Sequence, residues 1–365
     1  MVSVVLAGGG TAGHTSPLIA TAERLAELSP GLRLTCVGTP KGLESKVIPA
    51  AGLDLRMITP VPLPRKPSPD LLAVPFRLAR AVREARAVLG HAAADVVVGF
   101  GGYVALPVYL AARTRGVPVV LHEQNAVPGL ANKVAARFAR IVAVSFPGTP
   151  LPGARYVGLP VRAAIGRLNR DAARPAARAS FGFTGDRPLL LVSGGSQGAV
   201  AINGATFGAV DALLAAGFDV LHVLGPRNIG DAPGVVTDAA TGASYRPVAY
   251  VDAMETAYAA ADLMLGRSGA GTVVETATVG LPVVFVPLPH GNGEQARNAG
   301  FLIEGHAGVL VPNEELDPAR LLAEVLPLLG DPARLRAMSD ACRGLVPPDA
   351  ASALARLVLD VAKGA

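Results

Sequence analysis

The sequence predicts an α/β protein with two doubly wound domains, and three observations support that fold class. Short, continuous apolar runs alternate with stretches of helical spacing, which is typical of parallel sheets covered by helices on both faces. The alternation pauses once, over the charged and alanine-rich residues 162–188, and then starts again. Each half opens with an apolar run that leads directly into a glycine-rich turn. We therefore expect two sheets whose carboxyl edges face a shared ligand-binding cleft.

Nine short apolar runs are predicted to be strands, with helices between them. The first domain contains the runs 4–8, 33–38, 95–100, 117–123 and 141–145. The second domain contains the runs 189–194, 219–225, 262–266 and 282–288. Two amphipathic helices are also predicted, at 70–90 and at 349–365.

The composition fits a globular enzyme with many glycine loops, since 51% of the 365 residues are hydrophobic and 17% are charged. The two cysteines, Cys36 and Cys342, have no metal-binding or redox spacing, which indicates a reducing compartment. No cationic leader of a signal peptide precedes the first strand. The longest uncharged apolar stretch, Val96–Ala112, has 17 residues interrupted by glycines and Pro107, too short to cross a bilayer. We expect a soluble, cytoplasmic protein.

Positive charge is concentrated in residues 56–90, the basic window. It contains seven basic and two acidic residues, so its net charge of +5 equals that of the whole chain. Arg77, Arg80 and Arg83 recur at helical spacing between apolar residues. A basic amphipathic helix can lie on an anionic membrane surface, and it can equally be an ordinary helix whose arginines face water. Both interpretations stay open at this point.

The first glycine-rich turn, residues 8–14, is named the glycine loop. Gly8, Gly10 and Gly13 match the dinucleotide-binding spacing directly after a strand. That site also needs an acidic residue where the second strand ends, but no carboxylate follows "CVGTPKG" until Glu44. A P-loop is excluded because no Lys-Ser/Thr pair follows the glycines. What remains is a loop with little side-chain bulk at a helix start, open to a large polar ligand.

Polar residues gather where other strands end. His122, Glu123, Gln124 and Asn125 follow one strand, although Asn125 can also be a helix cap. In "RSGAGTVVET", small residues open a predicted helix and Glu275 follows one turn later. That pattern suits a diphosphate and two ribose hydroxyls, or a capping box built on Ser268 or Thr272. The amide-rich stretch 290–298, which includes His290, Asn292, Glu294, Gln295 and Asn298, suits sugar hydroxyls.

Several motifs are absent from the sequence. No D-x-D, G-x-S-x-G, C-x-x-C or H-E-x-x-H occurs in it. Two glycine turns, a diphosphate site at a helix start and no metal motif together point to a nucleotide-sugar transferase.

Eight ordered motifs resemble the MurG family within glycosyltransferase family 28. They are "GGGTAGH" (8–14), "GFGGYVALP" (99–107), "LHEQNAVPGLANK" (121–133), "VGLPVR" (157–162), "SGGSQGA" (193–199), "AYVDAME" (249–255), "RSGAGTVVETATVGLP" (267–282) and "NGEQARNA" (292–299). The resemblance runs nearly end to end, and "VPLPRKPSP" and "LPHGNGEQ" look similar to the actinobacterial branch. It implies the GT-B fold, two Rossmann-like domains facing across a cleft. The implied domains are 1–162, facing the acceptor and membrane, and 163–345, binding UDP-GlcNAc, with helix 346–365 packed back on the first.

The resemblance assigns UDP-GlcNAc contacts to residues of both domains. They are Thr11, Ala12 and Gly13 in the glycine loop, Asn125 at the donor sugar, Arg162 and Ser196 near the diphosphate, Val251 at the uracil, Ala270, Gly271, Thr272, Val273, Val274 and Glu275 in the nucleotide segment, and Gln295 at a GlcNAc hydroxyl. Gly266 and Gly271 depart from the usual family pattern, whereas Ala12, which stands where many members have glycine, is common in the actinobacterial branch. A glycine at position 271 loosens the helix start by about 1 kcal/mol relative to alanine, which would weaken donor ordering.

The implied reaction is an inverting transfer of GlcNAc to the 4-hydroxyl of lipid I, giving the lipid II of peptidoglycan synthesis, with no cofactor required. It needs a general base, for which His14 is the first choice, Glu123 the second and His122, which adjoins a strand, the third. The acceptor and membrane side is expected at Arg77, Arg80, Arg83 and Tyr103, which turns the basic window into a docking face.

The expected partners are UDP-GlcNAc, lipid I, the anionic cytoplasmic leaflet and other cell-wall synthesis proteins, without nucleic acid. The expected location is peripheral, on the cytoplasmic face of the membrane. Two rival functions remain. One is a soluble GT-B transferase of natural products, and the other is a sugar-nucleotide-binding relative without turnover.

Overall fold

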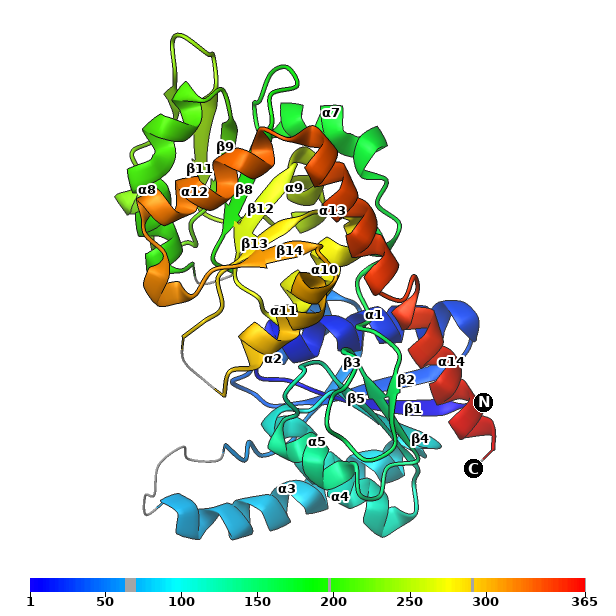
Figure 1. Ribbon diagram of the computed structural model, residues 1–365. Helices are drawn as coiled ribbons and strands as arrows, with labels where there is room; N and C mark the ends of the chain where they lie inside the picture. Colours follow the sequence, from blue (N-terminus) through cyan, green and yellow to red (C-terminus); the bar gives the residue numbers. More distant parts are fainter. Residues whose placement is uncertain (63–69, 196–197, 290–291, 365) are drawn as a thin grey trace. The chain divides into compact units, whose positions relative to one another are not determined.

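The structure is a computed structural model that describes residues 1–62, 70–195, 198–289 and 292–364. These residues form two compact units (Figure 1). Unit 1 consists of residues 1–162 together with the residues from Asp349 onward, and unit 2 consists of residues 163–348. Within the described ranges, each unit contains one seven-stranded sheet.

The sheet of unit 1 is parallel, with the strand order β3-β2-β1-β4-β5-β6-β7. Its strands are β1 (Ser3–Ala7), β2 (Arg33–Gly38), β3 (Asp54–Met57), β4 (Val96–Gly99), β5 (Val119–Glu123), β6 (Ile141–Val144) and β7 (Ala154–Tyr156). The order reverses between β1 and β4, where Ala7 is in register with Gly99. The loops that leave β1 and β4 therefore lie beside each other at the carboxyl edge, where open α/β sheets bind ligands.

Helices cover both faces of this sheet. They are α1 (Ala12–Leu28), α2 (Glu44–Ala50), α3 (Asp70–Ala92), α4 (Gly102–Arg115), α5 (Leu130–Ala135) and α14 (Ala350–Lys363). Alternate residues of β1 enter two separate cores: Val5 packs with residues of α3 and α4, and Leu6 with residues of α1 and α14. This double burial explains why the strand is apolar from Val4 to Ala7.

The last helix, α14, completes the core of unit 1. Leu354 and Val358 are fully buried in the same cluster as Leu18 of α1. Arg24 of α1 donates a hydrogen bond from Nε to Ser352 Oγ at 2.5 Å. Figure 1 shows red α14 beside blue α1, so opposite ends of the sequence meet on one face of the sheet.

The sheet of unit 2 has the order β10-β11-β9-β8-β12-β13-β14, and only β10 is antiparallel within the described residues. Its strands are β8 (Leu189–Ser193), β9 (Asp219–Val223), β10 (Val236–Thr237), β11 (Ser244–Val248), β12 (Leu263–Gly266), β13 (Val283–Phe285) and β14 (Gly308–Leu310). Its order reverses between β8 and β12, where Ser193 is in register with Gly266. The second glycine-rich turn thus follows a strand at a reversal point, as the first one does.

The helices of unit 2 lie before, between and after its strands along the chain. They are α6 (Ala163–Gly166), α7 (Arg170–Ser180), α8 (Val200–Ala215), η1 (Ile229–Asp231), α9 (Met254–Ala260), α10 (Ala270–Val279), α11 (Glu294–Glu304), η2 (Asn313–Glu315), α12 (Pro318–Leu329) and α13 (Pro332–Leu345). One large core joins α8, α12 and the inner strands, with Leu213, Leu265 and Val325 fully buried.

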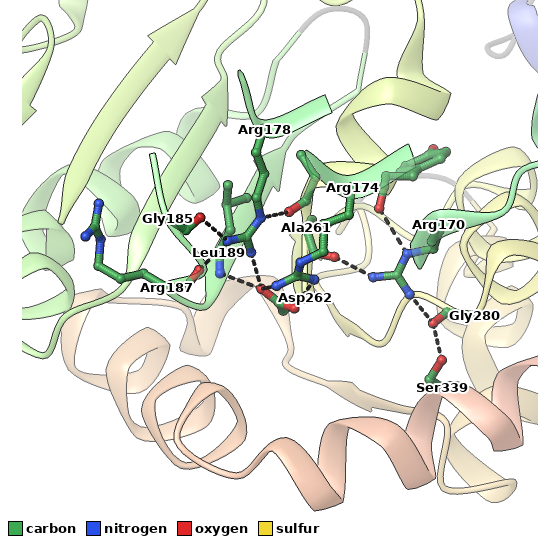
Figure 2. A network of polar contacts seen from close by, with 12 residues as sticks. Arg170, Arg174, Arg178, Gly185, Arg187, Leu189, Ala261, Asp262, Gly280 and Ser339 are labelled. Carbon is green, nitrogen blue, oxygen red and sulfur yellow. Dashed lines mark hydrogen bonds and ion pairs between the residues drawn. The ribbon is translucent and has the colours of Figure 1, made fainter. Parts of the chain in front are cut away.

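An arginine network fastens α7 to the amino edge of this sheet (Figure 2). Asp262, directly before β12, accepts hydrogen bonds from both terminal nitrogens of Arg174, from Arg178 and from the Leu189 amide. Arg170 donates to the carbonyl oxygens of Tyr258, Ala261 and Gly280. Burial lowers the pKa of Arg170 to about 10, so it stays charged at neutral pH. These arginines donate hydrogen bonds to carbonyl and carboxylate oxygens next to the starts of strands. That edge of the sheet is opposite the one that carries the glycine-rich turns.

All nine apolar runs predicted as strands are strands, and the two predicted amphipathic helices are α3 and α14. The apolar stretch Val96–Ala112 is divided between β4 and α4. Across the described ranges, the structure contains no helix with the length and apolar character needed to cross a bilayer.

Candidate active site

The glycine loop is shaped by close backbone packing at the carboxyl edge of unit 1. A Cβ atom at Gly8 would lie 2.9 Å from Cβ of Phe100. Gly10 has φ +92 and faces the Tyr103 ring, while Gly102 has φ +76 and would place a Cβ 2.7 Å from the Gly9 carbonyl oxygen. Positive φ and these short distances both require glycine. The loops after β1 and β4 therefore meet backbone to backbone.

His14 lies at the end of the glycine loop, in the first turn of α1. Its Nδ1 is 3.0 Å from Oγ1 of Thr11, the N-cap residue of the helix. The ring is half-buried. Burial lowers the pKa of His14, and the nearby Glu44 carboxylate opposes that effect by raising it. The positive end of the α1 dipole also favours the neutral ring. A neutral imidazole is the form that accepts a proton.

The neighbouring loop residues Thr11, Ala12 and Gly13 are all exposed, so the start of α1 is open to a ligand. The first amides of a helix have no partner within the helix. The structure thus places the three glycine-loop residues of the predicted donor site together with His14.

Glu123 is the centre of a second polar network in unit 1. Its carboxylate accepts hydrogen bonds from the Asn125 amide at 2.9 Å, the Gly129 amide at 3.0 Å and Asn132 Nδ2 at 2.8 Å. The residue is 2% exposed, and burial raises its pKa while these donors lower it. Tyr109 OH donates to Asn132 Oδ1, which extends the network. These donors occupy both carboxylate oxygens and hold the loop after β5.

His122 and Asn125 flank this carboxylate. His122 is fully buried, with Nε2 2.8 Å from the Gly158 carbonyl oxygen, and burial lowers its pKa to about 4. His122 lies within β5, and its burial leaves it the weakest of the three candidate bases. Asn125 is half-buried, and α5 starts later, after the N-cap Gly129, so Asn125 does not cap that helix.

In unit 2, α10 begins at the reversal point of the sheet. Its N-cap is Gly269, without a side-chain cap, so the alternative in which Ser268 or Thr272 forms a capping box is not what the structure contains. Ser268 is fully buried, and its hydroxyl has no hydrogen-bond partner among the described residues. The first amides of α10 are therefore not capped by side chains, so they have no partner within the helix.

Glu275 lies one turn into α10 and is held from outside the helix. Tyr258 of α9 donates a hydrogen bond from its hydroxyl to Glu275 Oε2 at 2.9 Å. The other oxygen, Oε1, is 4.0 Å from where a Cβ of Gly271 would lie. Sequence reasoning did not identify Tyr258, because nothing in the local pattern around it connects it to Glu275.

Two more residues of the predicted site, Val251 and Gln295, follow unit 2 strands at the same edge. Val251 is 8% exposed, so it can offer a ligand its main chain but little of its side chain. Gln295, in the first turn of α11, accepts a hydrogen bond from the Leu288 amide through Oε1 at 2.9 Å. Arg267 donates to the carbonyl oxygens of Val286 and Pro287, which ties the ends of β12 and β13 together.

Other predicted residues are placed elsewhere or fall outside the described ranges. Arg162 is half-buried at the end of unit 1. Arg77, Arg80 and Arg83 lie on α3. The predicted residues Ser196 and His290 lie outside the described ranges, as do Arg65 and Lys66, two of the basic residues of the basic window. Among the described residues, no group of three or more His, Cys, Asp or Glu side chains is arranged to hold a metal ion.

Two family domains match most of the chain. Residues 4–144 match the glycosyltransferase family 28 N-terminal domain, and residues 189–354 match the glycosyltransferase family 28 C-terminal domain. A Cutibacterium acnes protein is 61% identical over 99% of this chain and 98% of its own length. Its name is UDP-N-acetylglucosamine--N-acetylmuramyl-(pentapeptide) pyrophosphoryl-undecaprenol N-acetylglucosamine transferase. A Nocardioides protein of the same name is 56% identical, over 99% of this chain and 98% of its own length.

Solved structures agree with this result. The crystal structure of Acinetobacter baumannii MurG has a TM-score of 0.79 and 29% identity, over 99% of this chain and all of that one. The calicheamicin glycosyltransferase CalG4 has a TM-score of 0.66 at 20% identity, over 98% of this chain and 96% of that one, which is a likeness of fold alone. The two sheets, their loops and the near full-length identities lead to one conclusion: the chain belongs to glycosyltransferase family 28, in its MurG branch.

Proposed function

We propose that this chain transfers N-acetylglucosamine from UDP-GlcNAc to the 4-hydroxyl of N-acetylmuramyl-pentapeptide pyrophosphoryl-undecaprenol, in peptidoglycan synthesis. The observation that carries this proposal is 61% identity, over 99% of the chain, with a transferase named for this donor and this acceptor. The loops of each unit support it as well. The predicted site residues that the structure describes at the carboxyl edges of the two sheets have side chains suited to binding the donor or to accepting a proton.

Unit 2 holds the nucleotide in this proposal. The uncapped amides at the start of α10 bind the diphosphate, together with Ser196 and Arg162. Glu275, oriented by Tyr258, accepts hydrogen bonds from the ribose hydroxyls, and the main chain at Val251 contacts the uracil. Gln295 still has its Nε2 group for a sugar hydroxyl, since Oε1 already accepts from Leu288.

His14 is the general base in this proposal, and one tautomer suits the role. With the proton on Nδ1, the ring donates to Thr11 Oγ1 and leaves the lone pair of Nε2 free. Nε2 then takes the proton of the acceptor's 4-hydroxyl as its oxygen attacks the anomeric carbon. The bond from that carbon to UDP breaks, and the configuration inverts from α to β. Glu123 is less suited, because donors occupy both of its oxygens.

The departing UDP gains negative charge, which fixed dipoles and Arg162 stabilise without a cofactor in this proposal. Preorganised backbone amides at a helix start are effective for this purpose because they need no reorientation during the reaction.

Membrane docking is assigned to α3. Leu72 and Phe76 are each 79% exposed and lie one turn apart on this helix. Arg80 and Arg83, both exposed, continue the same stripe at helical spacing. Exposed apolar side chains followed by cations suit the boundary between acyl chains and anionic headgroups. A peripheral position on the cytoplasmic leaflet would bring the enzyme to its lipid-linked acceptor.

The test is UDP release from UDP-GlcNAc, measured with and without a short-chain lipid I analogue. Release that requires the analogue and matches formation of the disaccharide product is expected. Release with free small aglycones, but not with the analogue, would replace this proposal with natural-product glycosylation. Binding of UDP-GlcNAc without release under any of these conditions would identify a non-catalytic relative.

A further inference from the structure

We propose that Glu44 is a positioning residue whose buried carboxylate fixes the glycine loop and thereby the placement of His14. The inference rests on the proposed function, because it takes His14 as the general base. Glu44 is the first residue of α2, after β2, and it is fully buried.

The Glu44 carboxylate bonds to two different loops. Oε2 accepts a hydrogen bond from the Gly10 amide at 2.8 Å, within the glycine loop. Oε1 accepts from the amide of Thr39 at 3.0 Å and from its hydroxyl at 2.8 Å, in the loop after β2. Hydrogen bonds to an ionised acceptor are stronger than neutral ones. One side chain therefore joins the ends of β1 and β2.

The chain makes room for this carboxylate with glycines. A Cβ atom at Gly9 would lie 2.5 Å from Glu44 Cδ, one at Gly42 2.1 Å from Oε2, and one at Gly38 2.6 Å from Cγ. None of these three glycines has a positive φ, so their backbone conformation is open to any residue. It is the space occupied by Glu44 that requires glycine at all three positions.

A third loop joins through Tyr103. Its hydroxyl is 3.1 Å from Oγ1 of Thr39, and its ring carbon Cε1 would lie 3.0 Å from a Cβ at Gly10. The neighbouring Gly102 is tight against the glycine loop, and a Cβ there would lie 3.6 Å from Nδ1 of His14. The loops after β1, β2 and β4 thus form one hydrogen-bonded platform, with the Glu44 carboxylate inside it and His14 on it.

The Glu44 carboxylate acts on His14 by charge as well as by position. Two titratable side chains from other elements contact the glycine loop in the described structure: Glu44 of α2 and Tyr103 of α4. Of these two, Glu44 carries the charge. The negative charge of Glu44 raises the pKa of His14 against the larger effect of burial. Removal of that charge should therefore lower the pKa of the base, which packing alone would not do.

The Glu44→Gln variant tests the positioning role and the charge role of Glu44 by two different measurements. Glutamine keeps the size of the side chain, but its NH2 group must face the backbone N–H of either Gly10 or Thr39. Because both groups are donors, that hydrogen bond is lost. We expect kcat to fall by about 10- to 100-fold, since small misplacements of a catalytic group have effects of that order. The acid limb of the kcat/KM profile should move to lower pH. Affinity for UDP should stay at the wild-type value, because none of the nucleotide contacts proposed above is a glycine-loop residue.

Two further variants serve as comparison and control. Thr39→Val removes one donor but keeps the carboxylate charge, so kcat should fall less and the acid limb should not move. Glu23→Gln changes an exposed carboxyl on α1 and should match the wild type in every measurement.

The outcomes distinguish this inference from the proposed function. A wild-type enzyme that transfers no GlcNAc to the lipid I analogue would overturn the proposed function itself. An active wild type with a Glu44→Gln variant of unchanged kcat and unchanged acid limb would overturn the role of Glu44 alone. If Glu44→Gln fails to fold, Thr39→Val decides, because an unchanged kcat there would mean that Glu44 is needed only for folding.

Discussion

His14 and Thr11 form a hydrogen-bonded pair that is compatible with the ring tautomer proposed for the base. We expect His14→Ala to lower the single-turnover rate by about 10²- to 10⁴-fold, the usual contribution of a general base. Affinity for UDP-GlcNAc should change far less, because the nucleotide contacts are proposed in unit 2. Single-turnover kinetics and a donor titration test this, and equal losses in both would remove His14 as the base. Thr11→Val keeps the ring and should reduce the rate by a smaller factor.

Tyr258 orients Glu275 through one hydrogen bond, so its removal should weaken nucleotide binding. We expect Tyr258→Phe to cost about 0.5–1.5 kcal/mol in UDP affinity, the usual net value of such a bond. Glu275→Ala should cost more, since it removes the acceptor itself. Calorimetric titration with UDP measures both variants. Unchanged affinity in Glu275→Ala would exclude a contact between Glu275 and the ribose.

Sequence reasoning identified residues whose role depends on their own local pattern. His14 and Glu275 each stand beside small residues at a helix start, so the printed sequence is enough to select them. In the sequence, Glu44 is only the first carboxylate after the second strand, and no local pattern marks it as part of a site. Its actual place beside Gly10, 34 positions away, depends on β2 returning the chain to the same sheet edge. Contacts between segments of this kind leave no periodic signal.

At the scale of the element, two glycines with opposite requirements stand in α10 and at its C-cap. Gly271 has an ordinary φ, and a Cβ there would meet nothing closer than 4.0 Å. Gly271→Ala should therefore raise the free energy of unfolding by about 0.4–1 kcal/mol. Gly280 ends the helix at φ +67, with Arg343 Nε 2.6 Å from its potential Cβ. Gly280→Ala, the matched comparison, should destabilise the protein. Urea unfolding measures both, and a loss of stability in Gly271→Ala would contradict this account.

Helix α3 offers a test of membrane docking that leaves its ion pairs intact. Arg80 bonds Glu84, which in turn accepts from the Thr59 amide, so charge reversal there would also disturb packing. The double variant Leu72→Ser, Phe76→Ser removes two exposed side chains instead. Each should lose about 1.5–3 kcal/mol of apolar burial in the bilayer. We expect greatly reduced sedimentation with anionic vesicles.

Val235→Ser is the control for this experiment. Val235 is 62% exposed in unit 2, outside the proposed docking helix, and its replacement should leave sedimentation unchanged. Sedimentation of the double variant at the wild-type level would remove α3 as the docking element.

The strands that sequence reasoning missed share a physical property. The five additional strands are β3, β7, β10, β11 and β14. Four of them are the outermost strands of the two sheets, and β11 is paired with the edge strand β10. β7, for example, is exposed along its whole length. An edge strand needs no continuous apolar run because one side of it has no neighbour, so it resembles a loop in the sequence.

At the scale of the whole molecule, one buried histidine in each unit should make stability depend on pH. Burial lowers the pKa of His122 in unit 1 to about 4 and that of His222 in unit 2 to about 3. An unfolded histidine titrates near 6.5, so below that pH the unfolded chain takes up protons that the folded chain refuses. The free energy of unfolding should therefore fall, by at most about 1.4 kcal/mol per pH unit for each histidine.

Urea unfolding between pH 7.5 and 5 tests this expectation. Glu123, whose pKa burial raises, works in the opposite direction at the acidic end, so a histidine variant is needed to isolate the effect. His222→Gln should flatten the dependence. A variant with the same slope as the wild type would mean that His222 is protonated in the folded protein.

The fold as a whole is compatible with more functions than the individual site residues are. The calicheamicin glycosyltransferase CalG4 shares this architecture at only 20% identity. Two sheets with reversal points predict a ligand at each carboxyl edge, but not which ligand. The choice of donor and acceptor rests on the near full-length relatives and on the loop residues described above.

Because α14 covers α1 in the core of unit 1, the first half of the chain cannot finish folding when it leaves the ribosome. Leu18 and Leu25 of α1 lack this cover until all of unit 2 has been translated. A nascent chain that pauses within unit 2 would present this apolar surface to chaperones or to other nascent chains. Unit 2 is one continuous segment, so it is complete before the last helix of unit 1 has been synthesised. Unit 2 is therefore able to reach its native state first, although its synthesis begins later.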